Sequence, residues 1–295
     1  MSKIAFYSSD SGNHRFIEPI IKRLEEKGYA CQLYNNWHID NDASILWFDF
    51  CDQNLITASK ENAEFLKTKK VIARLHAVEY YMGFHHAIDW LCVSDLIFVS
   101  SHMQRMCNAD GALMVKQHVI HNGIDLDKFT FKERQNGLTL GYAGNIVPAK
   151  GILTMFHYFR ELRHYGDYKL KMAGLNRFSA RDLEFYKHYT KDLPIEETGE
   201  TGDINHWLEG VDYLWQPSHA ESFSLIIGEA MAKGIKPLIN NFYGADELWP
   251  TQNIYRDFTE FNLIVKDKYD STRYRNFVTK YSLDNAMIKI CQILS

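Results

Sequence analysis

The sequence predicts an α/β protein built from two Rossmann-like domains. The length of 295 residues is enough for about two domains. Short apolar runs alternate with longer helical patterns along the whole chain, which is typical of parallel sheets covered by helices on both faces. A polar, turn-rich segment at residues 126–137 interrupts this alternation, which then restarts. We therefore expect an N-terminal domain over residues 1–130 and a C-terminal domain over residues 136–270.

The N-terminal half carries apolar runs of strand length separated by helical patterns. The first helical pattern covers residues 15–28, with Gly28 as its expected C-cap. A second helix is expected around residues 54–68. The expected strands are residues 3–9, 30–35, 44–50, 70–76, 95–101 and 117–125.

The C-terminal half repeats the same alternation. We expect strands at residues 138–145, 168–174, 211–218 and 236–241, with a short strand or loop at 195–200. The expected helices are residues 151–166, 177–191, 204–210 and about 222–233. The tail at 271–294 has an amphipathic helical pattern, and its part from about 275 to 295 is expected to pack back on the N-terminal domain.

Composition narrows the class of protein. The formal net charge is −4, which weakens roles in nucleic-acid or anionic-membrane binding. The five cysteines are scattered without a Cys-x-x-Cys pair, which fits reduced thiols in a cytosol-like compartment and argues against structural zinc. The chain opens directly on a strand pattern, and no apolar run approaches the roughly 20 residues that span a bilayer. We expect a cytoplasmic protein, in a bacterial cytosol or in a host cytosol if a phage encodes it.

The stretch HAESFSLIIGEAMAKGIKPLINN, residues 219–241, contains two carboxylates in an unusual setting. Glu229 lies inside a run from Phe223 to Ala232 that has no other charge. A bare carboxylate there costs several kcal/mol unless it is paired, and two vicinal hydroxyls of a ribose would satisfy it. Glu221 precedes the expected helix, whose first backbone N–H groups can hold a phosphate. Taken alone, the two glutamates are also compatible with a solvent-facing helix and a surface loop.

This stretch resembles the signature of the retaining GT-B glycosyltransferases of family 4, in which two glutamates separated by seven residues precede Ala-Met-Ala-x-Gly. Three further segments match that family in the expected order. They are VIHNGIDLDKF at the domain junction, YAGNIVPAKGI at the phosphate loop, and GADELW at the end of the donor site. The resemblance covers Val119 to Trp249 and implies two Rossmann-like domains that face each other across a donor-binding cleft.

The resemblance implies roles for individual residues. Glu229 would hold the hydroxyls of the donor ribose, and Glu221 would contact the transferred sugar as a catalytic residue. Lys150 would neutralise the donor diphosphate, which requires a cation or a helix dipole when no metal is present. The backbone N–H groups that accompany Glu221 would come from Phe223, Ser224 and Leu225.

One position departs from the family pattern. The phosphate loop contains Asn145 after Gly144, where the family usually has arginine. An asparagine offers one neutral amide in place of a charged fork. Either Arg177 or another cation compensates, or the leaving group is held more weakly.

Two candidates lie in the N-terminal half. His76 ends an expected strand at a place where the family has a histidine lining the sugar pocket, although a histidine that only caps a strand fits the sequence equally well. Gly12 lies in the first strand-to-helix turn, where its backbone could approach the diphosphate.

The resemblance implies a retaining hexosyl- or pentosyltransferase. No double-displacement nucleophile is evident, so we expect front-face attack in which the departing phosphate takes the proton of the acceptor. Enzymes of this fold generally work without metal, so we expect no metal and no cofactor. The donor is expected to be a nucleotide-sugar, with UDP favoured over GDP.

Several acceptors and one other class of protein fit the sequence. Aromatic and histidine residues at Trp37, His38 and 79–90 suit sugar rings and also bases. A glycan or glycolipid precursor is the first expectation. Hydroxymethylated bases of phage DNA are the alternative acceptor, because the segment 266–277 is basic and aromatic. A nucleotide-sugar epimerase or binding protein of the same architecture is the second alternative. The sequence does not predict the oligomeric state.

Overall fold

The computed structural model describes residues 2–9, 14–111 and 113–295. The chain forms two compact units. Unit 1 consists of Met1–Gly123 together with Leu283–Ser295, and unit 2 consists of Ile124–Ser282. Each unit contains one six-stranded sheet, and all registered strand pairs are parallel. The alternation of strands and helices in the sequence is thereby confirmed as α/β architecture.

The sheet of unit 1 has the strand order β2-β1-β3-β4-β5-β6. Successive strands are therefore added first on one side of β1 and then on the other, so the strand order switches between β1 and β3. Doubly wound sheets bind ligands at such a switch point, at the carboxyl ends of their strands. The strands are β1 (Lys3–Tyr7), β2 (Ala30–Tyr34), β3 (Ile45–Phe48), β4 (Lys70–Leu75), β5 (Asp95–Phe98) and β6 (Lys116–Val119). The α-helices are α1 (Glu18–Glu26), α2 (Gln53–Glu61), α3 (Ala63–Lys67), α4 (Ala77–Tyr81), α5 (Ser101–Asp110) and α13 (Leu283–Leu294).

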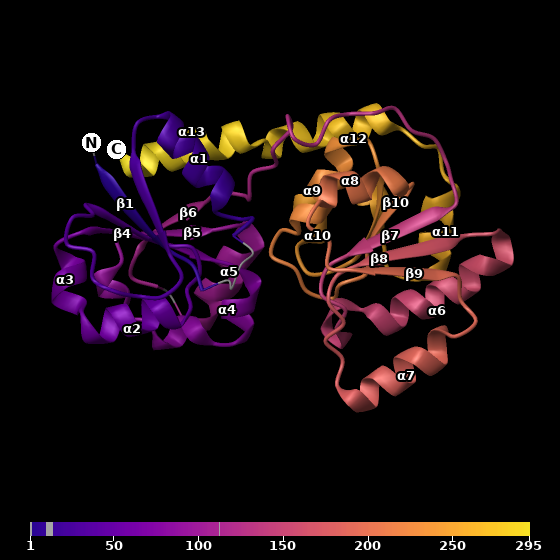
Figure 1. The fold of residues 1–295 in the computed structure, drawn as a ribbon, viewed down its shortest axis with the longest axis horizontal. Helices are drawn as coiled ribbons and strands as arrows, with labels where there is room; N and C mark the ends of the chain where they lie inside the picture. Colours follow the sequence, from indigo (N-terminus) through magenta and orange to yellow (C-terminus); the bar gives the residue numbers. More distant parts are fainter. Residues whose placement is uncertain (1, 10–13, 112) are drawn as a thin grey trace. The chain divides into compact units, whose positions relative to one another are not determined.

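Helices cover both faces of this sheet (Figure 1). Ile4 and Phe6 of β1 point to one face, where they pack with α1 and with Met287 and Ile290 of the C-terminal helix α13. Ala5 and Tyr7 are on the other face, against helices α2 to α5. Successive side chains of a strand point to opposite faces of the sheet. Because both faces of this sheet are covered by helices, the side chains of β1 are apolar on both faces.

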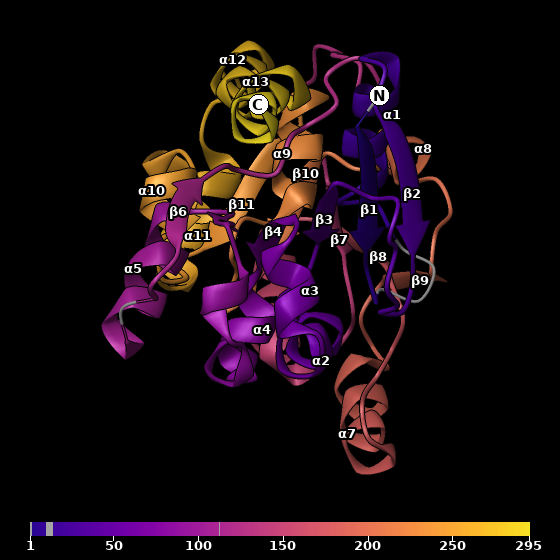
Figure 2. The ribbon, with the colours of Figure 1, turned by 90° about the vertical axis from the view of Figure 1, so that its left-hand side faces the viewer.

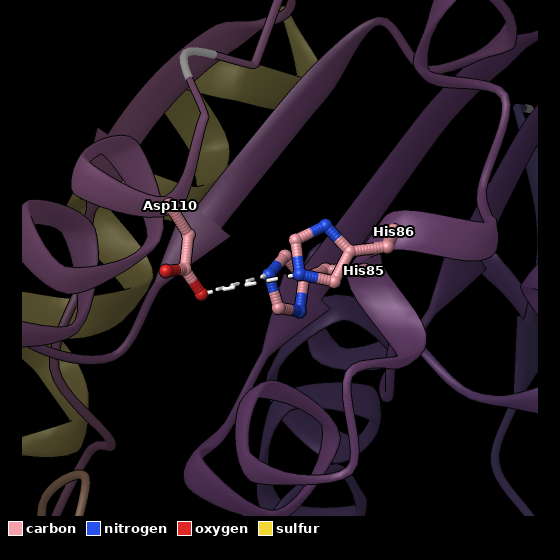
Figure 3. Close-up of side chains that lie close together, drawn as sticks. All are labelled: His85, His86 and Asp110. Atoms are coloured by element: carbon pink, nitrogen blue, oxygen red, sulfur yellow. Dashed lines mark ion pairs between the residues drawn. The ribbon is translucent and has the colours of Figure 1, made fainter.

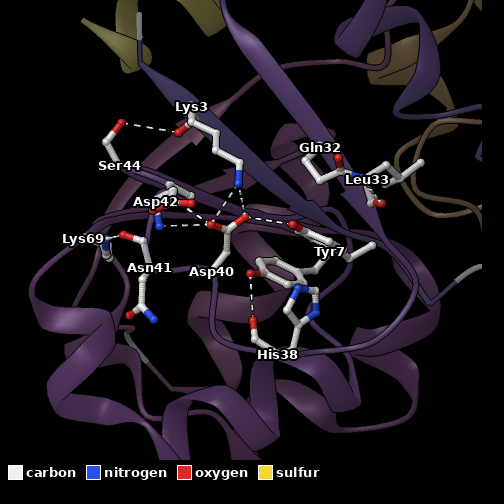
Figure 4. A network of polar contacts seen from close by, with 12 residues as sticks. Lys3, Tyr7, Gln32, Leu33, His38, Asp40, Asn41, Asp42, Ser44 and Lys69 are labelled. Atoms are coloured by element: carbon white, nitrogen blue, oxygen red, sulfur yellow. Dashed lines mark hydrogen bonds and ion pairs between the residues drawn. The ribbon is translucent and has the colours of Figure 1, made fainter.

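A polar network centred on Asp40 fixes the connection between β2 and β3 (Figure 4). Its carboxylate pairs with Lys3 Nζ at 2.7 Å and accepts hydrogen bonds from the Tyr34 hydroxyl and the backbone N–H groups of Asp42 and Ala43. Burial alone would raise the pKa of Asp40, but the hydrogen bonds from Lys3 and Tyr34 outweigh it and hold this pKa below its usual range.

The sheet of unit 2 has the order β12-β11-β10-β7-β8-β9, with the reversal between β7 and β10. One face packs against α6, α7 and α11 through Phe156, Tyr186 and Phe261. On the other face α8, α9 and α12 pack, as the two views show (Figures 1 and 2). The strands are β7 (Thr139–Ala143), β8 (Lys169–Ala173), β9 (Ile195–Gly199), β10 (Tyr213–Gln216), β11 (Lys236–Asn240) and β12 (Ile254–Tyr255). The α-helices are α6 (Ile152–Leu162), α7 (Ala180–Thr190), α8 (Ile204–Trp207), α9 (Leu225–Ala232), α10 (Ala245–Leu248), α11 (Phe258–Lys266) and α12 (Ser271–Val278).

Two predicted helices are interrupted. The helix expected at residues 54–68 is divided into α2 and α3, because Asn62 has a non-helical backbone with ψ of 31°. The helical tail expected at 271–294 is divided into α12 and α13, because the backbone of Ser282 is extended. None of the helices in the described ranges is long and apolar enough to cross a membrane.

The Asp40 network generates a stability prediction. Asp40→Asn removes the charge that Lys3 and three hydrogen-bond donors share. We expect the melting temperature at pH 7 to fall by about 2–6 °C, which corresponds to the loss of one or two hydrogen bonds. The depressed pKa makes this stabilisation fully present above the unfolded value of about 3.9 and lost as pH falls through the folded value. The difference between variant and wild type should therefore shrink below about pH 4.

Thermal unfolding followed by circular dichroism measures this effect. The matched control is Asp42→Asn, because Asp42 is an exposed neighbour in the same loop and should melt like the wild type. Equal melting temperatures for Asp40→Asn and Asp42→Asn at pH 7 would contradict the role assigned to the network.

Candidate active site

The candidate site lies in unit 2, at the carboxyl ends of β7 and β10. These two strands are neighbours in the sheet, and the strand order reverses between them. The segment after β7 carries Gly144, Asn145 and Lys150, and the segment after β10 carries Glu221 and the start of α9. Parallel strands bring their carboxyl ends to one edge of the sheet, so residues far apart in sequence meet there.

The segments after β7 and β8 pack directly on each other. The Gly144 amide donates to the Ala173 carbonyl at 2.9 Å, and a Cβ on Gly174 would lie 1.9 Å from the Gly144 carbonyl oxygen. Asn145 is exposed. The Arg177 amide donates to the Ile146 carbonyl at 3.1 Å, which places the backbone of Arg177 next to the segment of Asn145. The side chain of Arg177 is exposed and makes no ion pair within the described ranges.

Lys150 is held by a tight turn. It ends the short 3-10 helix Pro148–Lys150, and Gly151 follows in the left-handed region with φ of 70°. A Cβ on Gly151 would lie 2.1 Å from the Pro217 carbonyl oxygen. Only glycine combines this φ with so close an approach, so Gly151 brings the segment of Lys150 against the segment that follows β10.

Lys150 and Glu221 form an ion pair. Lys150 Nζ lies 2.6 Å from Glu221 Oε1, although the two residues are far apart in the sequence. Gln216, the last residue of β10, donates to the same Glu221 oxygen at 3.0 Å and to Ser224 Oγ at 2.6 Å. Burial, and then the neighbouring Glu221 carboxylate, raise the pKa of Tyr142 in β7. The pair therefore lies in a partly buried polar cluster that both strands build.

Helix α9 begins beside this pair. Its N-cap residue, Ser224, has φ of 66° and is the one non-glycine with positive φ among the described residues. Such a conformation costs about 1–3 kcal/mol and is most often found where a loop is shaped for binding. The first N–H groups of a helix have no partner within the helix and carry its positive dipole end, so the start of α9 suits an anion.

Phe223 fixes the segment that leads into α9. Its ring is fully buried and packs against Trp249 at 5.1 Å and Tyr281 at 5.1 Å. The predicted role of Phe223 concerned its backbone N–H, and the side chain is a packing anchor that holds that N–H in place.

Glu229 lies within α9 and is 6 % exposed. Every residue of the helix from Leu225 to Ala232 is buried, and Glu229 is its one ionisable residue. A solvent-facing glutamate on an amphipathic helix, which the sequence left open, is therefore wrong. Glu229 is therefore a buried carboxylate one to two turns from the start of α9.

His76 lies in unit 1, after β4, and is also buried. Its Nε2 is 3.2 Å from the Asp49 carbonyl oxygen and 3.3 Å from Arg74 Nε, and its ring lies between Phe16 and Phe50. Burial and the adjacent Arg74 lower the pKa of His76 well below its usual value, so the imidazole is neutral at neutral pH. Gly12, the other candidate of the N-terminal half, lies outside the described residues.

Some residues of the site escaped the sequence analysis. Gln216 ends the apolar run of β10 as its one polar residue, and that position at the carboxyl end of a strand could have identified it. In unit 1, Asp49 directly follows β3 and Arg74 lies near the end of β4, and the two form a buried ion pair at 3.1 Å. The chain also contains two Asp-x-Asp triplets, a pattern associated with metal-assisted sugar transfer, at residues 40–42 and 125–127. Asp40 belongs to the network with Lys3, and Asp125 caps its own turn.

Comparison with solved structures identifies the fold as GT-B. Sucrose-phosphate synthase from Thermosynechococcus elongatus has a TM-score of 0.79 at 11% identity, covering 100% of this chain and 98% of that chain. HepE of Anabaena, solved with UDP and glucose, has a TM-score of 0.74 at 15% identity, covering 100% and 99%. The lipopolysaccharide outer core galactosyltransferase WaaB has a TM-score of 0.70 at 15% identity, covering 99% of each chain.

A family model matches most of unit 2. Residues 137–253, which include the whole cluster around Lys150 and Glu221, match the model of Glycosyl transferases group 1. No curated protein sequence matches the chain.

The contact between Gly151 and Pro217 can be tested by Gly151→Ala. Alanine at positive φ is strained, and its Cβ would displace the Pro217 carbonyl, so we expect a loss of at least about 1–3 kcal/mol and a lower melting temperature. The control is Gly202→Ala, because a Cβ there meets nothing within 4 Å and should leave the melting temperature unchanged. If both variants melt like the wild type, the two segments are not fixed against each other.

Proposed function

We propose that this protein is a retaining glycosyltransferase that moves a sugar from a nucleotide-sugar to a hydroxyl group of an acceptor. The observation that carries the proposal is the Lys150–Glu221 pair at the start of α9, with Glu229 buried in the same helix. A cation and a helix N-terminus suit the diphosphate of a nucleotide-sugar, and the two carboxylates suit the hydroxyls of its sugar and its ribose. The family match over residues 137–253 supports this assignment.

UDP is the favoured nucleotide of the donor, with GDP as the alternative. HepE of Anabaena, which shares the fold over the whole chain, is solved with UDP and with UDP and glucose. Glu229 would hold the ribose hydroxyls, and the N–H groups at Phe223, Ser224 and Leu225 would receive the phosphate and sugar oxygens. Arg177, whose backbone amide bonds to the carbonyl of Ile146 next to Asn145, is our candidate for the cation that Asn145 does not supply.

Lys150 has two partners in this proposal, and they compete. Without donor it pairs with Glu221 at 2.6 Å, so neither charge is left uncompensated at the partly buried site. A bound diphosphate, with more negative charge than one carboxylate, would draw Lys150 toward itself. Glu221 would then be free to accept hydrogen bonds from the hydroxyls of the transferred sugar.

The proposed reaction proceeds on one face of the sugar. The acceptor oxygen forms a bond to the anomeric carbon while the bond from that carbon to the donor phosphate breaks. The acceptor proton passes to the departing phosphate oxygen, and the nucleoside diphosphate leaves with it. Lys150 and the N-terminus of α9 stabilise the negative charge that grows on the leaving group, without a metal or a cofactor.

We propose a glycan or glycolipid precursor as the acceptor. The basic and aromatic segment 266–277 raised the alternative of modified DNA. Its Lys266, Lys268 and Arg273 are exposed, whereas Arg275 and Tyr274 are used for packing. Arg275 donates to the carbonyls of Phe129, Ala232 and Leu126, and Tyr274 is buried. These groups are therefore committed within unit 2, and this observation does not favour nucleic acid.

Glu229→Gln should weaken the binding of UDP. The change keeps the size of the side chain and removes the charge that strengthens hydrogen bonds to the ribose, so we expect the Kd to rise about 10–100-fold. Isothermal titration calorimetry with UDP, GDP, ADP and dTDP measures the effect and identifies the base. The control is Glu184→Gln on α7, an exposed glutamate of the same unit. An unchanged Kd for the preferred nucleotide in Glu229→Gln would rule out the assignment to the ribose.

Lys150→Ala should lower the release of nucleoside diphosphate about 10²–10³-fold, the usual loss when one group that stabilises transition-state charge is removed. The assay uses radiolabelled nucleotide-sugars with glycan, lipid and hydroxymethylated DNA acceptors, and Lys169→Ala, an exposed lysine in β8, is the control. An epimerase would instead convert the free nucleotide-sugar without acceptor. That result, or full turnover in Lys150→Ala, would refute the proposal.

A further inference from the structure

Unit 1 contains a cluster of potential metal ligands that the proposed function does not use. His85 and His86 belong to the 3-10 helix Phe84–Ala87, and Asp110 is the last residue of α5. One ligand atom from each residue can be chosen so that all three lie within 4.8 Å of one another. His85 Nε2 is 3.7 Å and His86 Nε2 is 3.9 Å from Asp110 Oδ2, and Figure 3 shows both rings with a nitrogen toward the carboxylate.

The buried ring of His85 also points to a bound ion. Its side chain is 2 % exposed, and neither ring nitrogen has a hydrogen-bond partner among the described residues. A buried imidazole normally satisfies at least one nitrogen, because leaving a polar group without a partner costs free energy. The ring points with Nε2 toward Asp110, at a distance too long for a hydrogen bond and suited to two ligands of one ion.

The surroundings hold the cluster in place. Gly83, with φ of 70°, starts the turn that presents both histidines, and the indole of Trp90 donates to the His85 carbonyl at 2.9 Å. Tyr80 stacks on His85 with ring centroids 5.1 Å apart.

We propose that His85, His86 and Asp110 bind a divalent transition-metal ion of the zinc class. Two imidazoles and one carboxylate are ligands that suit Zn²⁺, Co²⁺ or Ni²⁺ and disfavour Mg²⁺, which prefers oxygen ligands. Three protein ligands leave a further position for water or another group. The ion would tie the turn after α4 to the end of α5 in unit 1. The cysteines take no part, so their scattered spacing does not bear on this site.

The test titrates Zn²⁺ into the purified full chain in competition with a chromophoric chelator. We expect one tight equivalent in the wild type that is weakened at least about 10–100-fold in His86→Ala and in Asp110→Asn. Both side chains are exposed, so these variants should keep the fold, which circular dichroism verifies.

The matched control is His118→Ala. His118 forms another His–Asp pair in unit 1, with Nε2 2.7 Å from Asp95, but no third ligand joins it among the described residues, so this variant should bind Zn²⁺ like the wild type. Co²⁺ provides a second readout, because its visible absorption reports the ligand field and should be lost in His86→Ala. Absence of a tight equivalent in the wild type, or equal loss in His118→Ala and His86→Ala, would overturn the proposal, whether or not the chain proves to be a glycosyltransferase.

Discussion

The reversal of strand order between β7 and β10 is the constraint on which the candidate active site depends. It makes two strands neighbours whose following segments turn to opposite sides of the sheet, which opens the edge above them to a ligand. At Gly151 the segment after β7 contacts the segment after β10, because the backbone of Gly151 approaches the Pro217 carbonyl more closely than a side chain would allow. The Lys150–Glu221 pair forms where these two segments meet, so the geometry of the charges follows from one glycine and from the sheet topology.

Electrostatics explains why this arrangement can persist before a donor binds. Lys150 and Glu221 neutralise each other, and Gln216 satisfies both the Glu221 carboxylate and the Ser224 hydroxyl. The strained backbone of Ser224 is held between this network and the buried ring of Phe223. The site is therefore preorganised by its own hydrogen bonds, and the proposed donor would exchange partners with them while the backbone stays in place.

The strands were predictable from sequence because burial on both faces produces continuous apolar runs, as in the segments of β1 and β10. The break at Asn62 was not, since a single asparagine is compatible with a helix and only the packing of α2 and α3 decides its backbone. Glu229 stood out as a lone charge in an apolar run. The pairing of Lys150 with Glu221 could not be derived from spacing, because a contact across 71 positions depends on tertiary structure, and only the family resemblance placed both residues at one site.

The end of β4 in unit 1 shows how burial limits the chemistry of a residue. His76 is neutral because burial and Arg74 both disfavour a second proton, so it cannot supply a positive charge to a phosphate. Glu79, whose carboxylate accepts from the His76 and Cys51 amides, is so buried that its pKa rises to about 7. A neutral imidazole and a carboxyl that titrates near neutrality can orient a hydroxyl by hydrogen bonds. His76 therefore does not supply the cation of the proposed reaction, a part that the proposal assigns to the partly exposed Lys150 of unit 2.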